Sequence, residues 1–546
     1  MRVCLALCLG LFVATAAASQ GARTLPLTDP AYEHLAWLQR RGLLLELDPT
    51  AVPYRVGEVR RALRVAEGAE LRPRERRRVV AVREAVGRPV HAREGAVLGG
   101  AALTLGARAT NNDRLDPLRY TESGRASDGA DASLALGPVN PFPYGLGWFG
   151  LGVGEGTTGV AAQLGWRTDP YLVDDPDGFP AAKRLVSRNE DSYVAAHGTL
   201  AGARIGRVDE RWAGSATPAL VLGDNARAFD ALAVRIGGSR LSLTSRLGEL
   251  DSANEDGTFT GRNGDTFRGD PGIRRFHAAR RLAWRPSRRF QLTLQEAVVY
   301  SSPTASASLS YLAPTQAFAL LVDSSPKNDE QNIIFSGSFW WHAGTAVLSG
   351  QVAIDDFDFG AEVPVLAGTG AVEVPRALGE ADLVLGLTAV SSRSYNTDQA
   401  PGRYVFGQRG IATFANDYVH ARAALAWADP AGAPGLTLTP EAQLLLQGEG
   451  TILEDRVPDG EASLLFGTVE RTVRLGVGTL YTPAAIRLGP GAPPLRLFAR
   501  ADLGVNFTRN GENVPGADAA RFVGVVGAGV KVRVGGVVRV DEASGE

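Results

Sequence analysis

Residues 495–507 read LRLFARADLGVNF, and this stretch decides the fold class of the chain. All of its odd positions are apolar, and four of its six even positions are polar: Arg496, Arg500, Asp502 and Asn506. Because side chains alternate between the two faces of a β-strand, the stretch predicts a strand with one apolar and one polar face. A tilted strand needs roughly nine to eleven residues to cross a bilayer, and this run is longer. The pattern therefore predicts a transmembrane barrel strand, with lipid outside and a polar interior.

The same two-residue period recurs from residue 96 to residue 540, most clearly in 419–427, 436–447 and 471–481. Counting every candidate predicts roughly sixteen to twenty strands, with eighteen favoured. A sheet that spans a membrane must close on itself, because an open edge leaves backbone groups unsatisfied in lipid. We therefore predict an all-β fold: a large antiparallel transmembrane β-barrel with a small N-terminal α-helical region. A soluble β-sandwich would also alternate, but the length and number of the strands favour the barrel.

The composition excludes several classes of function. The two cysteines, Cys4 and Cys8, both lie in a predicted signal peptide, so neither a disulfide framework nor a thiolate metal site is expected. A formal net charge of −2 argues against a general nucleic-acid binder. The six histidines lie in separate segments without metal-ligand spacing, and no phosphate loop or dinucleotide fingerprint occurs in a strand–helix context. We expect no metal, no cofactor and no enzymatic activity.

The chain divides into four predicted regions. Residues 1–18 read as a secretory signal peptide that ends in a run of alanines. Residues 24–93 predict a helical region, periplasmic or acting as a plug, in which Asp29 and Pro30 begin a helix and Gly42 follows its end. The β-barrel is predicted over 94–540, followed by a polar tail over 541–546.

One predicted hairpin, formed by 273–285 and 289–301, carries two charges on faces that are otherwise apolar. Matching the strand ends places Arg280 opposite Leu294 and diagonal to Glu296, within reach of a long side chain. Two unpaired charges that face lipid would cost several kcal/mol. We therefore predict that Arg280 and Glu296 pair with each other or are turned inward by a bulge. Both a polar lumen cluster that contacts a ligand and a register-fixing ion pair are open as interpretations.

Several short motifs that are shared with one known protein family occur between residues 25 and 357, in the same order as in that family. They are Leu25-Pro26-Leu27, Gly206-Arg207 with Trp212, Leu222-Gly223-Asp224-Asn225-Ala226, Arg280-Arg281-Leu282, Glu296 with Tyr300, and Asp355-Asp356-Phe357. In these motifs the chain resembles the Wzi-type capsule assembly proteins, which are outer-membrane β-barrels with an N-terminal helical region. The resemblance implies a surface protein that binds or organises exported polysaccharide without catalysis.

Seven residues are candidates for a polysaccharide-binding or polar lumen cluster. They are Arg207, Trp212, Asn225, Arg280, Glu296, Asp355 and Asp356. The last two are adjacent, so in a continuing strand they point to opposite faces and do not form an acid/base dyad.

Two functions from different classes follow from these observations. The first is the binding or organisation of exported, capsular polysaccharide at the cell surface, and the second is a porin-like channel for small solutes. In either case we expect an outer-membrane location in a Gram-negative-type bacterium, after removal of the signal peptide. The expected partners are polysaccharide, outer-membrane lipid and the barrel-insertion machinery, but not nucleic acid, and the expected state is a monomer.

Overall fold

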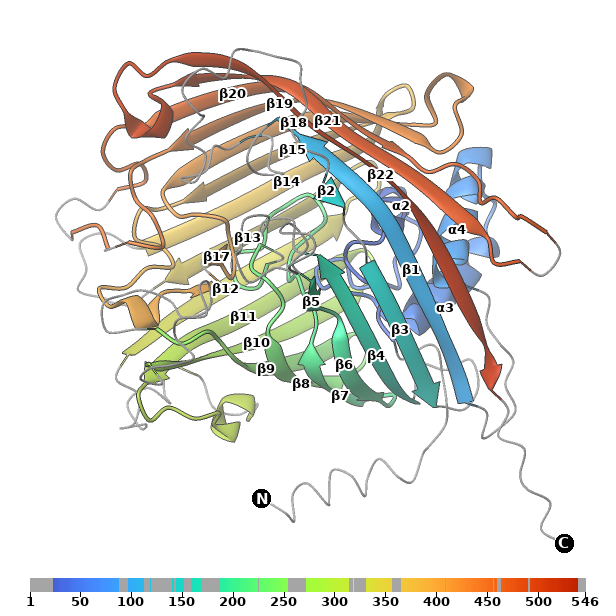
Figure 1. The fold of residues 1–546 in the computed structure, drawn as a ribbon, viewed down its shortest axis with the longest axis horizontal. Coiled ribbons are helices and arrows are strands. Elements are labelled where there is room, and N and C mark those ends of the chain that lie inside the picture. Colours follow the sequence, from blue (N-terminus) through green and yellow to red (C-terminus); the bar gives the residue numbers. More distant parts are fainter. Residues whose placement is uncertain are drawn as a thin grey trace, which may run out of the picture.

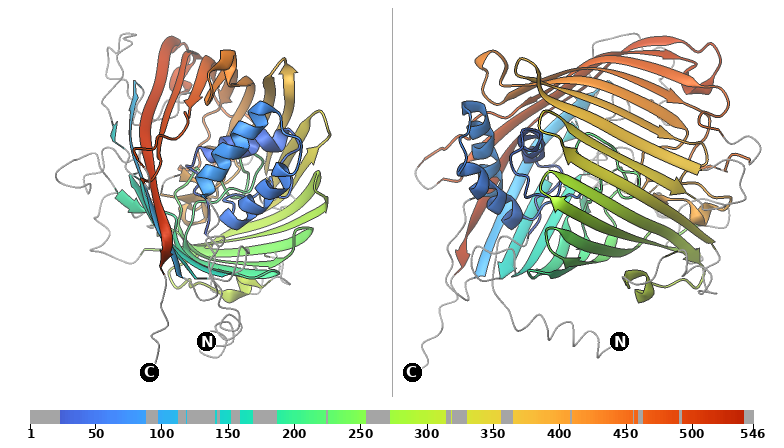
Figure 2. Two further views of the ribbon diagram at one scale, coloured as in Figure 1. Left: turned by 90° about the vertical axis from the view of Figure 1, so that its right-hand side faces the viewer. Right: turned by 180° about the vertical axis from the view of Figure 1, so that it is seen from behind.

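The computed structural model shows a tube of long strands with helices of the N-terminal region at one mouth (Figures 1 and 2). It describes residues 23–87, 97–111, 118, 140–141, 144–151, 159–168, 187–223, 225–253, 272–313, 318, 330–355, 365–407, 409–454, 456–458, 463–489 and 492–538. The helices are α2 (Ala31–Arg40), α3 (Val56–Glu67) and α4 (Pro73–Val86). Among the described residues, no helix is long and apolar enough to span a membrane.

The strands follow the helices and continue to the end of the described chain. They are β1 (Val97–Thr110), β2 (Asn140–Pro141), β3 (Tyr144–Leu151), β4 (Gly159–Thr168), β5 (Ser187–Asn189), β6 (Ser192–His197), β7 (Ala201–Arg207), β8 (Asp230–Gly237), β9 (Leu241–Glu249), β10 (Arg274–Ser287), β11 (Phe290–Ser302), β12 (Glu330–His342), β13 (Val347–Asp355), β14 (Val365–Leu378), β15 (Ala381–Val390), β16 (Val405–Phe406), β17 (Arg409–Gly410), β18 (Tyr418–Ala428), β19 (Leu436–Gln447), β20 (Glu470–Tyr481), β21 (Leu495–Arg509) and β22 (Ala519–Val538).

The sheet closes because its first and last strands pair. β1 is antiparallel to β22 along its whole length, from Val97↔Val538 to Thr110↔Val525, and it pairs with β3 on its other side. Of the twenty strands in the described sheet, β2 and β5 are short pieces beside β1 and β4, so eighteen strands go round the ring. Each pairs antiparallel with its neighbours, which confirms the predicted large antiparallel barrel. A closed ring leaves no unpaired edge in lipid.

The two faces of β21 agree with the predicted alternation. Leu497 and Phe507 point outward, where 41% and 48% of their surface is exposed, and these side chains would meet lipid. Asn506 points inward and is buried, and its amide oxygen accepts a hydrogen bond from Arg474 Nη1 of β20 at 2.9 Å. Arg474 Nη2 also donates to Asp502 Oδ1 at 2.6 Å. The polar positions of this strand are therefore used inside the barrel.

The two ends of the barrel differ in their connections. At the end where the helices lie, which we call the turn end, short turns join β6 to β7, β8 to β9, β10 to β11, β12 to β13 and β14 to β15. At the opposite end, which we call the loop end, long connections join β7 to β8 and β15 to β18. Short turns at one end and long loops at the other are typical of outer-membrane barrels.

The N-terminal helices begin and end at residues that the sequence marks. Asp29 Oδ1 accepts a hydrogen bond from the first N–H of α2, on Ala31, at 3.0 Å, so this side chain does the capping while Pro30 occupies the N-cap position. Gly42 follows α2 with a φ of +77°, a left-handed conformation that glycine adopts without a steric penalty. α2, α3 and α4 enclose a separate apolar core that includes Leu38 and Val82.

The register of the β10–β11 hairpin differs from the prediction. Arg280 lies directly opposite Glu296, and Leu282 lies opposite Leu294. The pairing shifts between Trp284 and Ser287. This irregularity includes Pro286, which has no N–H to donate to the ladder and so favours a bulge. The predicted pairing of Arg280 with Leu294 assumed a regular turn between the two strands, and it was wrong because the turn is irregular.

Candidate functional site: the filled lumen and its arginine-lined cavity

The loop end of the lumen is filled by the connections β7–β8 and β15–β18, whose described residues we call the loop core. Their apolar side chains pack directly on inward-facing alanines and valines of the wall, in one shared hydrophobic cluster. Two buried tyrosines of the β15–β18 connection bind the backbone of the β7–β8 connection. Tyr404 donates to Val221 O at 2.8 Å, and Tyr395 donates to Leu220 O at 2.9 Å. Loop and wall are therefore parts of one interior.

Polar side chains of the inner wall hold the filling in place. Gln351 of β13 accepts a hydrogen bond from Leu220 N of the loop core at 3.1 Å. Nearer the turn end, Arg281 Nη2 of β10 lies 2.9 Å from Asp48 Oδ2, and Gln291 Nε2 of β11 donates to Asp48 Oδ1 at 2.9 Å. The inward polar face that the two-residue period predicts thus contacts protein at these positions.

The turn end is filled by residues 23–87, which we call the N-terminal segment. Ion pairs join this segment to the wall. In α2 and the residue after it, Arg40 lies 3.1 Å from Glu373 and Arg41 lies 2.6 Å from Asp382. The side chains of Arg41 and Asp382 are almost completely buried. α4 makes the same kind of contact, for example through Glu75, which lies 2.7 Å from Arg376.

The two fillings meet inside the barrel. Val52 of the N-terminal segment and Arg211 of the loop core exchange backbone hydrogen bonds, each N–H donating to the other C=O at 3.0 Å. Ala51 packs against the loop core. The described part of the lumen is therefore occupied from both ends, with a bridge of two backbone hydrogen bonds between the occupants.

A cavity of about 760 Å³ remains between the N-terminal segment and the inner wall of β6–β10. Eight arginines and four carboxylates line it, an excess of four positive charges. They are Arg55, Arg61, Arg204, Arg235, Arg240, Arg281, Arg285 and Arg288, with Glu46, Asp48, Glu58 and Glu210. This concave surface, which lies inside the barrel and carries a net positive charge, is our candidate functional site.

Two of the cavity carboxylates, Asp48 and Glu210, have lowered pKa values because arginines surround them. Burial alone would raise the pKa of Asp48, but the charges of Arg281 and Arg285 outweigh burial and hold it at about 2. Burial likewise opposes ionisation of Glu210, whose pKa is nevertheless lowered by Arg204 and Arg246. The electrostatic field of the cavity therefore favours negative charge.

Three of the sequence-predicted site residues lie in or against the loop core. Trp212 is buried there and also lines the cavity. Asn225 Nδ2 donates to Gly410 O at 2.9 Å and so ties the two connections of the loop core together. Asp355, at the end of β13, is buried and accepts a hydrogen bond from Tyr395 N. In this structure, Asn225 and Asp355 hold the loops in place.

The other predicted residues lie elsewhere. Arg207 ends β7 and forms an exposed ion pair with Asp230 at 2.7 Å. Arg280 and Glu296 lie on the outer face, 3.8 Å apart, and are therefore not part of the lumen. Asp356 falls outside the described residues.

Arg280 and Glu296 are shielded on the outer face by the chain that follows β11. Arg280 Nη2 donates to Tyr311 O at 3.0 Å, and Glu296 accepts a hydrogen bond from Phe318 N. The guanidinium also lies over the ring of Phe318, 4.1 Å from its centroid. Of the two predicted arrangements, the two charges therefore adopt the first, a pair on the outer face, and protein rather than lipid covers them.

Apart from Trp212, the residues that line the cavity were not predicted from the sequence, although one signal was present. Arg281 and Arg285 lie four residues apart on the inward face of β10, where the alternation places polar side chains. Asp48, which pairs with Arg281, lies 233 residues earlier. No local sequence pattern predicts a contact between residues so far apart in the chain. The described residues contain no group of three or more His, Cys, Asp or Glu side chains that could hold a metal ion.

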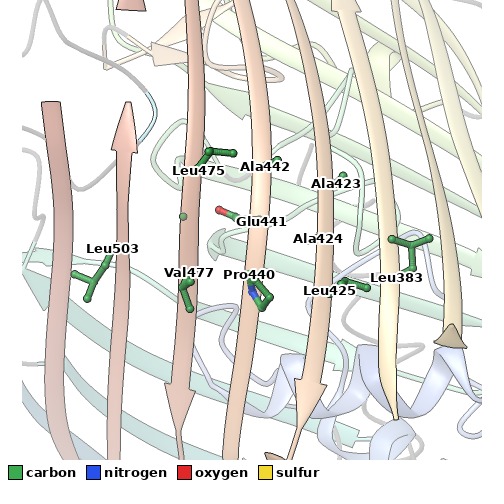
Figure 3. Close-up of a pocket in the computed structure, with 11 residues that line it drawn as sticks. Leu383, Ala423, Ala424, Leu425, Pro440, Glu441, Ala442, Leu475, Val477 and Leu503 are labelled. Atoms are coloured by element: carbon green, nitrogen blue, oxygen red, sulfur yellow. The ribbon is translucent and has the colours of Figure 1, made fainter. Parts of the chain in front are cut away.

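A second concave surface lies on the outside of the barrel. Figure 3 shows Leu383, Leu425, Leu475 and Val477 around small residues of β18–β20. Glu441, also drawn there, belongs to the inward face of β19 and pairs with Arg422 at 2.7 Å. The groove is therefore an apolar part of the outward wall, as expected for a surface that faces acyl chains.

Comparison with known proteins finds no matching family model and no matching curated sequence. Among solved structures the chain is similar to Wzi of Escherichia coli, described as an outer-membrane protein involved in group 1 capsule assembly and as a carbohydrate-binding β-barrel. The TM-score is 0.58 at 12% identity, covering 93% of this chain and 99% of that one. The outer-membrane protein OpdK of Pseudomonas aeruginosa matches with a TM-score of 0.43 at 14% identity, over 81% of this chain and 99% of that one. The chain thus has the fold of the outer-membrane β-barrels.

Proposed function

We propose that this chain is a non-catalytic protein of the bacterial outer membrane that binds or organises an exported polysaccharide at the cell surface. The Wzi barrel, whose fold it shares, is described as carbohydrate-binding and as involved in capsule assembly. In this proposal the N-terminal segment and the short turns face the periplasm, and the long connections face outward. Lipid and the barrel-insertion machinery are its other partners, and it acts as a monomer.

The observation that carries the proposal is the occupied lumen. A solute channel needs a continuous aqueous path, lined by polar side chains that are free to face water. Here Gln351 binds the loop core, and Arg281 and Gln291 bind Asp48 of the N-terminal segment. Because these inward groups contact protein, the interior favours a barrel whose ligand is held rather than conducted.

Two measurements on the same preparation test the proposal against the porin alternative. The full chain, purified in detergent after removal of the signal peptide, is applied to a glycan array and reconstituted in a planar bilayer. We expect binding to a subset of bacterial polysaccharides and no stepwise conductance. Open channels with no glycan binding would contradict the proposal and favour a porin.

A further inference from the structure

We propose that the arginine-lined cavity at the turn end binds carboxylate groups of an acidic glycan. This inference rests on the proposed function and deepens it, because it names the chemical class of the ligand and a place where the ligand is recognised. It differs from the sequence-based site prediction, since of the seven residues predicted there only Trp212 lines the cavity.

The cavity is open to solvent at the turn end. Its rim includes the turns that join β6 to β7, β8 to β9 and β10 to β11, with Thr199, Ser239 and Arg288 among its exposed residues. Its deeper part reaches Trp212 and Glu210 of the loop core. In the orientation proposed above this mouth faces the periplasm, so the cavity would bind the glycan during its export, on the periplasmic side of the membrane.

The charges of the cavity are only half compensated within the protein. Each carboxylate has an arginine partner in the cavity: Asp48 with Arg281, Glu46 with Arg288, Glu58 with Arg55 and Glu210 with Arg204. The remaining arginines, Arg61, Arg235, Arg240 and Arg285, have no carboxylate within ion-pair distance among the described residues. Asp48 acts on Arg285, and Glu58 on Arg235, from beyond ion-pair distance, so the cavity as a whole keeps an excess of four positive charges that a ligand can neutralise.

Arg285 shows most clearly why an anion would be favoured. It is 8% exposed, and its Nη atoms donate to neutral carbonyl oxygens, at 2.9 Å to Leu45 O and 3.3 Å to Glu46 O. Arg235 similarly donates to Gly238 O at 3.1 Å. A charge that is taken out of water without a counter-ion is costly, and a nearby carboxylate removes part of that cost. Guanidinium groups also match the planar geometry of a carboxylate.

The rest of the lining favours a sugar over a bare anion. Hydroxyl groups of Thr199, Ser239 and Thr244 line the cavity, and the aromatic residues Tyr54 and Trp212 contribute to its surface. The volume of about 760 Å³ lies within the range of small-molecule sites, roughly 300–1,000 Å³. Inorganic phosphate would occupy little of this space and would leave the hydroxyl groups unused.

Isothermal titration calorimetry on the full chain in detergent tests the inference with three probes: a short oligogalacturonate, its methyl-esterified form and inorganic phosphate. Two cavity variants, Arg235→Gln and Arg285→Gln, are compared with Arg83→Gln. Arg83 lies in α4, outside the cavity lining, and pairs with Glu67 at the surface. Testing both cavity positions guards against one variant failing to fold.

We expect oligogalacturonate to bind the unchanged chain and to bind each folded cavity variant about tenfold more weakly, a loss of about 1.4 kcal/mol. Its affinity for Arg83→Gln should be unchanged. The methyl ester should bind at least tenfold more weakly, and added salt should reduce the affinity of the acid form. Equal binding of the ester, or no effect of either cavity variant, would overturn the inference. Phosphate binding as tight as that of oligogalacturonate would overturn its glycan part.

The glycan array separates failure of this inference from failure of the proposed function. Array binding to neutral glycans that the cavity variants leave unchanged would contradict the cavity site and still support the proposed function. An array without any bound glycan, together with no calorimetric signal from oligogalacturonate, would contradict both.

Discussion

The N-terminal segment and the loop core occupy opposite ends of the same lumen, but different interactions hold them there. The loop core shares its hydrophobic cluster with the wall, through inward residues such as Ala297 and Val299. The N-terminal segment has a cluster of its own, in which Ala428 is the one wall residue among the described buried members. It contacts the wall through ion pairs such as Arg41–Asp382, and through one small apolar cluster of Leu45 with Trp340 and Val347.

This difference indicates that the two fillings have different degrees of independence. Removing the loop core from the wall would expose apolar surface on both. The free-energy cost of exposing such surface to water is about 25 cal/mol per Å². Undocking the N-terminal segment would break only its small apolar contacts with the wall, those of Ala428, Trp340 and Val347, and would separate charges, which water and salt can stabilise. We therefore infer that the loop core unfolds together with the barrel, whereas the N-terminal segment can be loosened on its own.

The largest expected effect comes from a change within the loop core. Trp212→Ala removes a buried aromatic side chain from the shared cluster and should lower the free energy of unfolding by about 3–5 kcal/mol. Denaturant unfolding in detergent, followed by circular dichroism, measures this loss. Trp284→Ala, on the outer face where 49% of the side chain is exposed, is the matched control and should cost less. Equal losses would contradict the shared interior.

A change in the ion pairs that join the N-terminal segment to the wall should act mainly on that segment. Asp382→Ala leaves Arg41 buried without its partner, which should cost about 3 kcal/mol. We expect faster proteolytic cleavage within the helices and little change in the unfolding of the strands. Glu380→Ala, which removes the exposed partner of Arg74, should cost less than about 1 kcal/mol. If Asp382→Ala weakened strands and helices alike, the two fillings would not be independent.

The smallest expected effect is a pH dependence at Asp48. Its pKa in the folded protein is about 2, below the value near 3.9 of an unfolded chain, so the stabilisation is complete above pH 5. It is lost as the pH falls from about 4 to about 2, and amounts to about 2 kcal/mol. Asp48→Asn should lack this part of the acid sensitivity in chemical unfolding between pH 5 and pH 2. Parallel stability curves for the two proteins would contradict the ion pair with Arg281.

Much of the fold could be predicted because it depends on a local period. In β21 the alternation of Leu497 and Phe507 with Asp502 and Asn506 assigns each residue to a face without knowledge of any partner strand. The register of β10 and β11 could not be predicted in the same way. It depends on the geometry near Pro286, because a register shift at the turn changes the partner of every residue from Arg274 to Trp284.

The candidate site was largely beyond prediction from the sequence. Arg281 and Arg285 could be placed on the inward face, but their neighbours come from the N-terminal segment. Trp212 was selected from a motif and does line the cavity. Arg280 and Glu296 were expected either to pair or to turn inward, and they pair. The chain that covers them was not foreseen, because nothing in residues 302–313 indicates that they fold back over the outer face.

The sequence by itself determined that the chain forms a membrane barrel, because a two-residue period fixes the face of every side chain and closure follows from the need to satisfy each backbone group in lipid. Only the tertiary structure decided what fills the barrel and where a charged cavity remains. Those features arise from contacts such as Asp48 with Arg281 and Val52 with Arg211, whose partners are far apart in the chain and meet only when the wall has closed.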